Sequence, residues 1–319
     1  IQGAVLMRLY IAGHTGLVGS ACVDYFSRLS DVVLLTAPRS ELDLTDTQAV
    51  HRWLASERPD AVILAAGRVG GIAANIRSPA EFIYENVLIE ANVIHGAWKA
   101  GVARLLNFGS SCMYPKQCPQ PMRVERLMTG PVEPTSEPYA VAKWAGVSLC
   151  ASYSRQHKVR FISAIPATVY GPRDSFDPES AHVLSALIRK LHAARQQRCQ
   201  EVTLWGSGRA RREFLYADDL ASACAVLLQR YEAAAPVNIG SGASCTGREL
   251  ASLVADVVGF EGQIRWDATR PDGAPEKRLH SDVMRLLGWS PQVTLRDGVE
   301  RTYRWFLEHE TKEVSCASS

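Results

Sequence analysis

The sequence lacks the features that would direct it to a membrane or to an oxidising compartment. No apolar run approaches the roughly 20 residues that span a bilayer, and the opening stretch IQGAVLM has no basic region ahead of an apolar one, as a secretory signal would have. The eight cysteines are scattered and form no CxxC pair. We therefore expect reduced thiols in a cytoplasmic protein, rather than disulfides or a metal site.

The chain also lacks an excess of charge of either sign. It has 35 lysines and arginines against 33 aspartates and glutamates, a formal net charge of +2. This balance gives no reason to expect a nucleic acid or an acidic membrane surface as a partner. With 319 residues, 47% of them apolar, the chain is long enough to bury a large core.

Apolar strand-like runs alternate with helix-like stretches through the first half of the chain. This alternation predicts an α/β fold with a Rossmann-type, doubly wound parallel sheet over residues 7–170, and we expect the native chain to start at Met7. Beyond residue 170 the regularity breaks. We expect residues 171–310 to form mainly a smaller C-terminal α/β substrate-binding lobe, with some segments returning to the first lobe. Residues 1–6 and 311–319 are expected to be flexible tails.

Three glycines follow the first expected strand at a spacing typical of dinucleotide binding. The segment IAGHTGLVGS contains Gly13, Gly16 and Gly19, where the strand gives way to a helix. Glycines there let the backbone turn tightly and approach a pyrophosphate, which the helix N-terminus attracts. Leu17 and Val18 complete this expected cofactor-binding segment. The alternative is a tight structural turn without a ligand.

The end of the second expected strand favours NADP over NAD. An acidic residue there binds the ribose 2′-hydroxyl of NAD, whereas a basic residue accommodates a 2′-phosphate. In LLTAPRSELDL no acid follows the strand immediately, but Arg39 does. We expect NADP(H) as the cofactor, with a solvated role for Arg39 as the alternative.

The segment PYAVAKWAG places Tyr139 and Lys143 four residues apart at the start of an expected helix. Side chains at this spacing share a face, so the ammonium can lie near the phenol beside a bound ribose. A nearby cation lowers the pKa of a phenol from about 10 and makes proton exchange practicable near neutrality. Ser110 or Ser111, at the end of the strand ARLLNF, is expected to bind the substrate oxygen beside this tyrosine.

These motifs together resemble the extended short-chain dehydrogenase/reductase family and, within it, the GDP-L-fucose synthases. The resemblance covers roughly residues 7–310 and is carried by IAGHTGLVGS, GSSCMYPK, EPTSEPYAVAK, SFDPESAHVLSALIRK and LWGSGRARREFLYADDLA. It implies NADPH-dependent 3,5-epimerisation and 4-reduction of a GDP-linked 4-keto-6-deoxy sugar. It also implies a homodimer formed through two long helices, for which residues 79–101 and 139–157 are suitable.

The same resemblance implies the catalytic residues, which are Ser110, Cys112, Tyr139, Lys143 and His182. Cys112 and His182 would exchange protons at C3 and C5, and Tyr139 would protonate the C4 oxygen as NADPH delivers hydride to C4. Inversion of a carbon needs a base on one face and an acid on the other, and a thiol and an imidazole suit this work near neutral pH. Which of the two is the base stays open.

The substrate-binding candidates are basic, aromatic or hydroxyl side chains suited to a nucleotide diphosphate sugar. They are Ser111, Lys190, Trp205, Arg212 and Lys277. Enzymes that act on GDP-linked dideoxyhexoses, in GDP-colitose synthesis, or on 6-deoxy-heptoses share similar motifs, so these substrates remain alternatives. A nucleotide-binding protein without catalysis is a more remote alternative.

Three further positions bear on these expectations. Thr15 stands where the family often has an arginine, so a preference for NADP depends more on Arg39. Ser185 replaces a frequent proline in the helix expected over residues 180–197. His192, deeper in the same helix, is expected on the surface.

Overall fold

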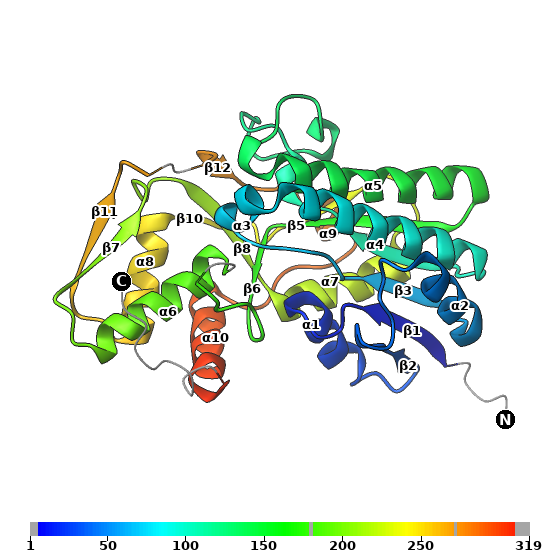
Figure 1. The fold of residues 1–319 in the computed structure, drawn as a ribbon, viewed down its shortest axis with the longest axis horizontal. Helices are drawn as coiled ribbons and strands as arrows, with labels where there is room; N and C mark the ends of the chain where they lie inside the picture. Colours follow the sequence, from blue (N-terminus) through cyan, green and yellow to red (C-terminus); the bar gives the residue numbers. More distant parts are fainter. Residues whose placement is uncertain (1–5, 179–180, 271–272, 310–319) are drawn as a thin grey trace.

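Six parallel strands form the central sheet of the first lobe (Figure 1). The computed structural model describes residues 6–178, 181–270 and 273–309. Apart from Leu6, the tails expected at residues 1–6 and 311–319 therefore lie outside the described residues. In spatial order the strands are β2 (Val32–Leu35), β1 (Met7–Ala12), β3 (Ala61–Leu64), β4 (Arg104–Phe108), β5 (Arg160–Pro166) and β9 (Val237–Ile239). The Rossmann-type prediction is confirmed. The strand order changes direction between β1 and β3, which is where such sheets bind ligands.

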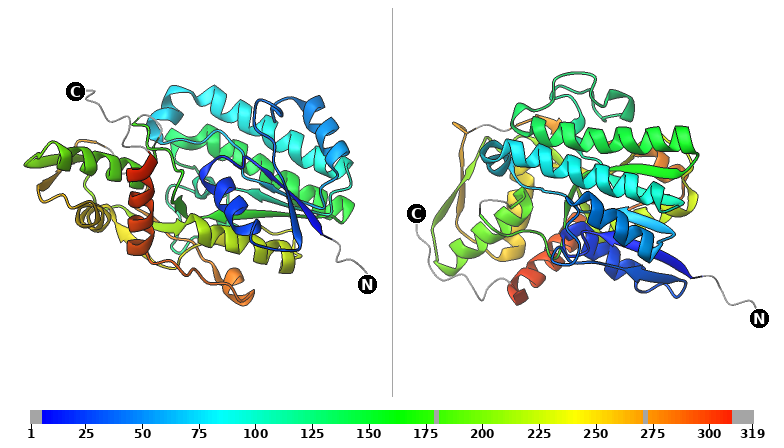
Figure 2. Two further views of the ribbon diagram at one scale, coloured as in Figure 1. Left: turned by 90° about the horizontal axis from the view of Figure 1, so that it is seen from below. Right: turned by 45° about the vertical axis from the view of Figure 1, so that its right-hand side comes forward.

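Helices cover both faces of this sheet (Figures 1 and 2). One layer contains α2 (Thr47–Glu57), α4 (Pro79–Lys99) and α5 (Glu137–His157), and the other contains α1 (Leu17–Phe26) and α7 (Ala217–Arg230). A short helix α3 (Ile72–Arg77) precedes α4. Within the described residues, no helix is long and apolar enough to cross a membrane.

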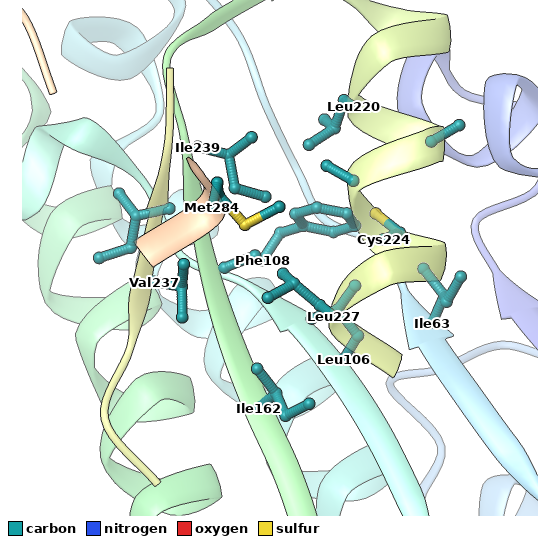
Figure 3. Close-up of a cluster of buried hydrophobic side chains, with 14 of the residues drawn as sticks. Ile63, Leu106, Phe108, Ile162, Leu220, Cys224, Leu227, Val237, Ile239 and Met284 are labelled. Carbon is teal, nitrogen blue, oxygen red and sulfur yellow. The ribbon is translucent and has the colours of Figure 1, made fainter. Parts of the chain in front are cut away.

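The first lobe has a core on each face of the sheet, and Figure 3 shows the one between the sheet and α7. Aliphatic side chains of β3, β4, β5 and β9 pack there against α7, together with the sulfur atoms of Cys224 and Met284. Strands buried on both faces need apolar residues in succession, which explains the continuous apolar runs of the sequence. All seven cysteines in the described part of the chain are free thiols.

The second lobe has its own sheets and its own core. Strand β8 (Arg211–Tyr216) pairs with β6 (Thr168–Tyr170), β10 (Ser244–Thr246) and β12 (Glu276–Lys277), while β7 (Glu201–Trp205) pairs with β11 (Gln263–Asp267). The helices of this lobe are α6 (Val183–Gln196), α8 (Gly247–Val258) and α10 (Leu295–His309). Helix α7, which follows β8 directly, packs on α1, and the short helix α9 (Asp282–Leu286) lies beside β9. Segments from the second half of the sequence therefore alternate between the lobes.

The apolar run VRFISAIPATVYG contains two strands. Strand β5 ends at Pro166, and β6 begins two residues later and pairs with β8 in the other sheet. Between them, the N–H of Ala167 donates to the carbonyl oxygen of Ile239 at 2.8 Å. The chain therefore crosses from one lobe to the other at Ala167.

The expectation that His192 lies on the surface is wrong. Its side chain is buried, and its Nδ1 lies 3.0 Å from the hydroxyl of Tyr303 on α10. Helix α6 packs on α8, and its apolar face joins the core of the second lobe, so the histidine is covered. Burial lowers the pKa of His192, with the charge of Arg195 acting in the same direction, which favours the neutral imidazole.

Candidate active site

The loop after β4 is held in a tight turn that aims the Cys112 thiol. A Cβ at Gly109 would lie 2.7 Å from the Cε of Met113, so a larger residue would require that side chain to shift. Ser110 then caps a 3-10 turn over Ser111–Met113, and its Oγ accepts the N–H of Cys112 at 3.2 Å. The backbone conformation, rather than a flexible loop, therefore sets the position of the thiol.

Cys112 is half-buried and lies beside a cation from the second lobe. The Nζ of Lys277, on β12, donates to its Sγ at 3.9 Å. Burial opposes ionisation of the thiol, but the ammonium of Lys277 favours it. Hydrogen bonds with Ser110 and Ser136 and the nearby His182 act in the same direction. The pKa of Cys112 is therefore lowered, which suits a proton acceptor.

His182 is the residue before α6, and it lies beside the buried carboxylate of Asp174. The Nδ1 of His182 is 3.6 Å from Oδ1 of Asp174. The adjacent Asp174 carboxylate raises the pKa of His182, burial opposes this, and the charge of Cys112 adds to the rise. The imidazole therefore keeps its proton to a higher pH, which suits a proton donor.

Tyr139 and Lys143 both lie in the first turns of α5, but the pKa of Tyr139 is raised, whereas the sequence predicts a lowered one. Burial raises the pKa of Tyr139, and negative charge on Cys112 and Glu90 raises it further, while a hydrogen bond with Ser110 opposes the rise. The prediction that Lys143 lowers this pKa is wrong, because its ammonium is bound to the Glu90 carboxylate. The phenol therefore carries its proton at neutral pH.

Glu90 connects α4 to the catalytic helix. Its side chain is 1% exposed, and that of Lys143 is 6% exposed. Glu90 lies against Gly146 of α5, where a Cβ would lie 1.8 Å from Glu90 Oε2. Burial raises the pKa of Glu90, while the charge of Lys143 and the Gly146 N–H favour the carboxylate. The glycine thus gives the carboxylate the space to reach the lysine.

Sequence reasoning missed three of these polar residues, namely Glu90, Asp174 and Ser136. Glu90 is the single acidic residue in the apolar stretch VLIEANVI, a pattern that indicates a buried, paired charge. Asp174 lies in a loop and Ser136 in the short 3-10 helix before α5, and the sequence of neither segment offers a comparable signal. Only their distances to the catalytic side chains reveal them.

The glycine loop after β1 fits a dinucleotide. Gly13 has φ +83°, and a Cβ at Gly19 would lie 2.0 Å from the carbonyl oxygen of Gly13. Helix α1 begins after Gly16, which provides no side-chain cap, so its first N–H groups lack a side-chain acceptor. Leu17 and Val18 form the first turn of this helix and pack against the core. Such a terminus binds phosphate oxygens.

Arg39 lies in the loop after β2, at the same edge of the sheet. Its side chain is 76% exposed and pairs with Asp43 at 3.7 Å, an interaction that contributes little at a solvated surface. The guanidinium can therefore turn toward a phosphate without a large loss.

The substrate-binding candidates fall into two groups. Arg212 and Lys277 are partners in register on the parallel strands β8 and β12, and Lys277 contacts Cys112. Ser111 belongs to the same 3-10 turn as Cys112. Lys190 and Trp205 lie elsewhere, around β7.

At β7, both remaining candidates have partners within the protein. The Nζ of Lys190 donates to the carbonyl oxygen of Thr203 at 2.7 Å, and burial lowers its pKa. The Trp205 ring is 68% exposed, and the guanidinium of Arg270 lies 5.0 Å from its centroid. Their roles in substrate binding stay predictions.

Comparisons with known proteins agree with this geometry. Residues 9–240 match the NAD dependent epimerase/dehydratase family. The chain is 49% identical over 302 residues to GDP-L-fucose synthase 1 of Arabidopsis thaliana, covering 95% of this chain and 94% of the relative. It is 46% identical over 314 residues to GDP-L-fucose synthase of Escherichia coli, covering 96% and 98%. A GDP-L-colitose synthase of Yersinia pseudotuberculosis is 33% identical, covering 96% and 100%.

Solved structures share the whole fold. A GDP-6-OMe-4-keto-L-xylo-heptose reductase from C. jejuni superposes with a TM-score of 0.90 at 31% identity, covering 96% of this chain and 99% of that one. A GDP-L-fucose synthetase from Naegleria fowleri bound to NADP has a TM-score of 0.89 at 26% identity, covering 98% and 96%.

Proposed function

The chain belongs to the NAD dependent epimerase/dehydratase family and, within it, to the GDP-L-fucose synthases, and from this premise we propose that it converts GDP-4-keto-6-deoxy-D-mannose to GDP-L-fucose. The reaction inverts C3 and C5 and reduces C4 with NADPH. One observation carries the proposal: Cys112 lies beside the Lys277 ammonium, and His182 lies beside the Asp174 carboxylate. These partners lower the pKa of the thiol and raise that of the imidazole, and the two groups interact with each other. A plain reductase needs only the tyrosine.

The two shifted pKa values assign the roles in epimerisation. The 4-keto group acidifies the protons on C3 and C5, and Cys112, as thiolate, removes one of them. The electron pair moves onto the C4 oxygen, where the hydroxyl of Ser110 stabilises the enolate. His182, as imidazolium, returns a proton from the opposite face and so inverts the carbon. Proton exchange with solvent then restores both groups for the second centre.

Reduction uses the tyrosine as an acid. NADPH supplies the hydride that adds to C4 when it is bound at the glycine loop. The Tyr139 phenol gives its proton to the C4 oxygen, and its raised pKa means that this proton is in place at neutral pH. Ser110 hydrogen-bonds the phenol and stabilises the phenolate that remains.

Several features support NADP(H) as the cofactor. The loop from Gly13 to Gly19 would hold the pyrophosphate, with Leu17 and Val18 beside it, and Arg39 would pair with the 2′-phosphate. Tyr139 and Lys143 would lie along the nicotinamide ribose. The free cysteines in the described part of the chain fit the reducing cytoplasm, where we propose that the enzyme works.

The hexose substrate is favoured over the alternatives by similarity. Identity to proteins named GDP-L-fucose synthase reaches 49%, against 33% for the GDP-L-colitose synthase and 31% for the heptose reductase. In this assignment, Ser111, Lys190, Trp205, Arg212 and Lys277 contact the GDP-linked sugar, with Lys277 closest to the reacting carbons because it contacts Cys112.

The direct test incubates the purified chain with GDP-4-keto-6-deoxy-D-mannose and NADPH. We expect NADPH to be consumed in equal amount with the formation of GDP-L-fucose, identified by NMR. The matched controls are the corresponding GDP-linked 4-keto-3,6-dideoxyhexose and 6-deoxy-4-keto-heptose, for which we expect lower kcat/KM. Higher kcat/KM on either control would reassign the substrate, and no NADPH consumption with any of them would reject the function.

We also propose that the enzyme is a homodimer formed through α4 and α5. These helices lie side by side on the outside of the molecule (Figures 1 and 2). Their outer face carries Tyr84, which is 65% exposed, and Val141, which is 37% exposed. A groove between the helices is lined by Pro79, Ala80, Ile83, Glu137, Pro138 and Val141. An exposed apolar face of this kind is typical of an interface between copies of a chain.

The double substitution of Tyr84 and Val141 by glutamate is expected to separate the dimer, because it would bury four charges in a symmetric interface. Sedimentation velocity should give twice the chain mass of 35.0 kDa for the wild type and one chain mass for the variant. Leu286→Glu, at an 86% exposed position on α9, is the control and should stay dimeric. A wild type that sediments as a single chain at micromolar concentration would contradict the proposal.

A further inference from the structure

We propose that Asp174 is a positioning residue for catalysis, whose buried carboxylate holds the His182 imidazole by its Nδ1 and turns its Nε2 toward the substrate. The inference rests on the proposed function of His182 as a proton donor. It adds a residue that neither motif nor spacing singled out, and it gives a purpose to Ser185.

Asp174 lies in the loop between β6 and α6, with 7% of its surface exposed. Its Oδ2 accepts a hydrogen bond from the hydroxyl of Ser185, in the first turn of α6. Its Oδ1 accepts the N–H of Ser175 at 2.8 Å and faces Nδ1 of His182 at 3.6 Å. A donor in the loop and a donor in α6 thus hold the carboxylate in place.

The helix geometry brings His182 and Ser185 to the same carboxylate. His182 is the N-cap of α6, and its carbonyl oxygen accepts the N–H of Ala186 at 2.9 Å. Residues three apart lie on the same side of a helix, so Ser185 is beneath His182. The serine hydroxyl binds one carboxylate oxygen and leaves the other for the imidazole.

A purely structural role explains this arrangement less well. Burial of a carboxylate is costly when only neutral donors satisfy it, and an imidazolium supplies the missing charge. The Nδ1 of His182 is itself buried and has no partner within normal hydrogen-bond distance, although it faces Asp174. A small movement of the imidazole would complete the hydrogen bond.

The chemical consequence follows from the two ring nitrogens. A carboxylate at Nδ1 selects the tautomer with the proton on Nδ1 when the ring is neutral, and it stabilises the imidazolium. The charged groups that act on His182 are Asp174 and Cys112, and the thiol in turn contacts Lys277. Charges therefore alternate along Lys277, Cys112, His182 and Asp174, which favours a thiolate and an imidazolium at the same time.

The test begins with the wild-type chain, labelled with ¹⁵N-histidine and free of substrate. The His182 resonances are identified by their loss in His182→Gln. We expect the neutral ring to carry its proton on Nδ1. A neutral ring protonated on Nε2 would overturn the proposal, and this measurement needs no variant of Asp174.

The second measurement compares Asp174→Asn with Asp177→Asn, an exposed carboxylate of the same loop. We expect Asp174→Asn to lower the His182 pKa and Asp177→Asn to leave it unchanged. An unchanged His182 pKa in Asp174→Asn would overturn the proposal. Because this titration uses no substrate, its outcome is independent of the proposed function.

The third measurement follows deuterium uptake at the sugar carbons in D2O. Asp174→Asn should slow this exchange about 10²-fold, which is in the range for loss of a positioned acid, and the alkaline fall in rate should move to lower pH. NADPH affinity should stay unchanged, because the Asp174 side chain binds Ser185 and faces His182, neither of which belongs to the glycine loop. Normal exchange with a normal pH profile would overturn the proposal.

Discussion

Tyr139→Phe is expected to lower the rate of NADPH oxidation by about 10³-fold, because it removes the acid that protonates the C4 oxygen. The substitution keeps the ring and its contact with Phe82, so the fold and NADPH affinity should be preserved. Epimerisation should continue, since Cys112 and His182 remain. The measurement combines NADPH consumption with deuterium uptake at C3 and C5 in D2O, which separates reduction from proton exchange.

The matched control for this prediction is Tyr153→Phe, in the same helix. Tyr153 lies in the C-terminal half of α5, where its hydroxyl is 2.6 Å from Nδ1 of His95. Loss of this hydroxyl should leave reduction nearly unchanged. Since burial raises the pKa of Tyr139, the phenol stays protonated through neutral pH, and the wild-type reduction rate should not fall with rising pH in that range. Near-normal reduction by Tyr139→Phe would show that another group protonates the oxygen.

Cys112→Ser is expected to lower deuterium uptake at the sugar carbons by about 10³-fold, because a hydroxyl at this position does not ionise near neutral pH. NADPH affinity should be unchanged. Cys118→Ser is the control, since this thiol is also half-buried in the following loop but has a raised pKa. Unchanged deuterium uptake in Cys112→Ser would remove the thiol from the mechanism.

The pH dependence of the same exchange tests the role of Lys277. A lowered thiol pKa means that the thiolate forms at lower pH, so the rate should rise with pH and level off earlier than for an ordinary thiol. In Lys277→Gln the cation is lost, and this rise should move to higher pH. Alkylation of Cys112 by iodoacetamide as a function of pH measures the same shift without substrate. An identical alkylation profile in the two proteins would contradict activation by Lys277.

The ion pair between Lys143 and Glu90 changes how the YxxxK motif is understood in this chain. A lysine with its charge balanced by a buried carboxylate does not lower the pKa of the phenol, and the phenol remains an acid. Reduction requires a protonated phenol at its start. The pair also fixes Lys143 at the face of α5 on which the ribose is expected.

Local patterns in the sequence were sufficient to predict the strands of the first lobe and the turns at their ends. The glycine loop follows β1, and the GSSC segment follows β4, because strand alternation and turn residues act over a few neighbours. The division of VRFISAIPATVYG between two sheets could not be predicted, since both parts are equally apolar and only pairing with β8 or β9 separates them. The burial of His192 depends in the same way on α8 and α10.

By itself, the sequence determined which chemical groups the site contains, because motif, spacing and resemblance identify Cys112, Tyr139, Lys143 and His182. Only the tertiary structure decided their protonation. Lys277 is 165 residues from Cys112, and Glu90 is 53 residues from Lys143. A pKa responds to burial and to charges within a few ångströms, and separation along the chain does not give these distances. The sequence therefore named a thiol and an imidazole, and the fold lowers the pKa of the first and raises that of the second, as the proposed roles of base and acid require.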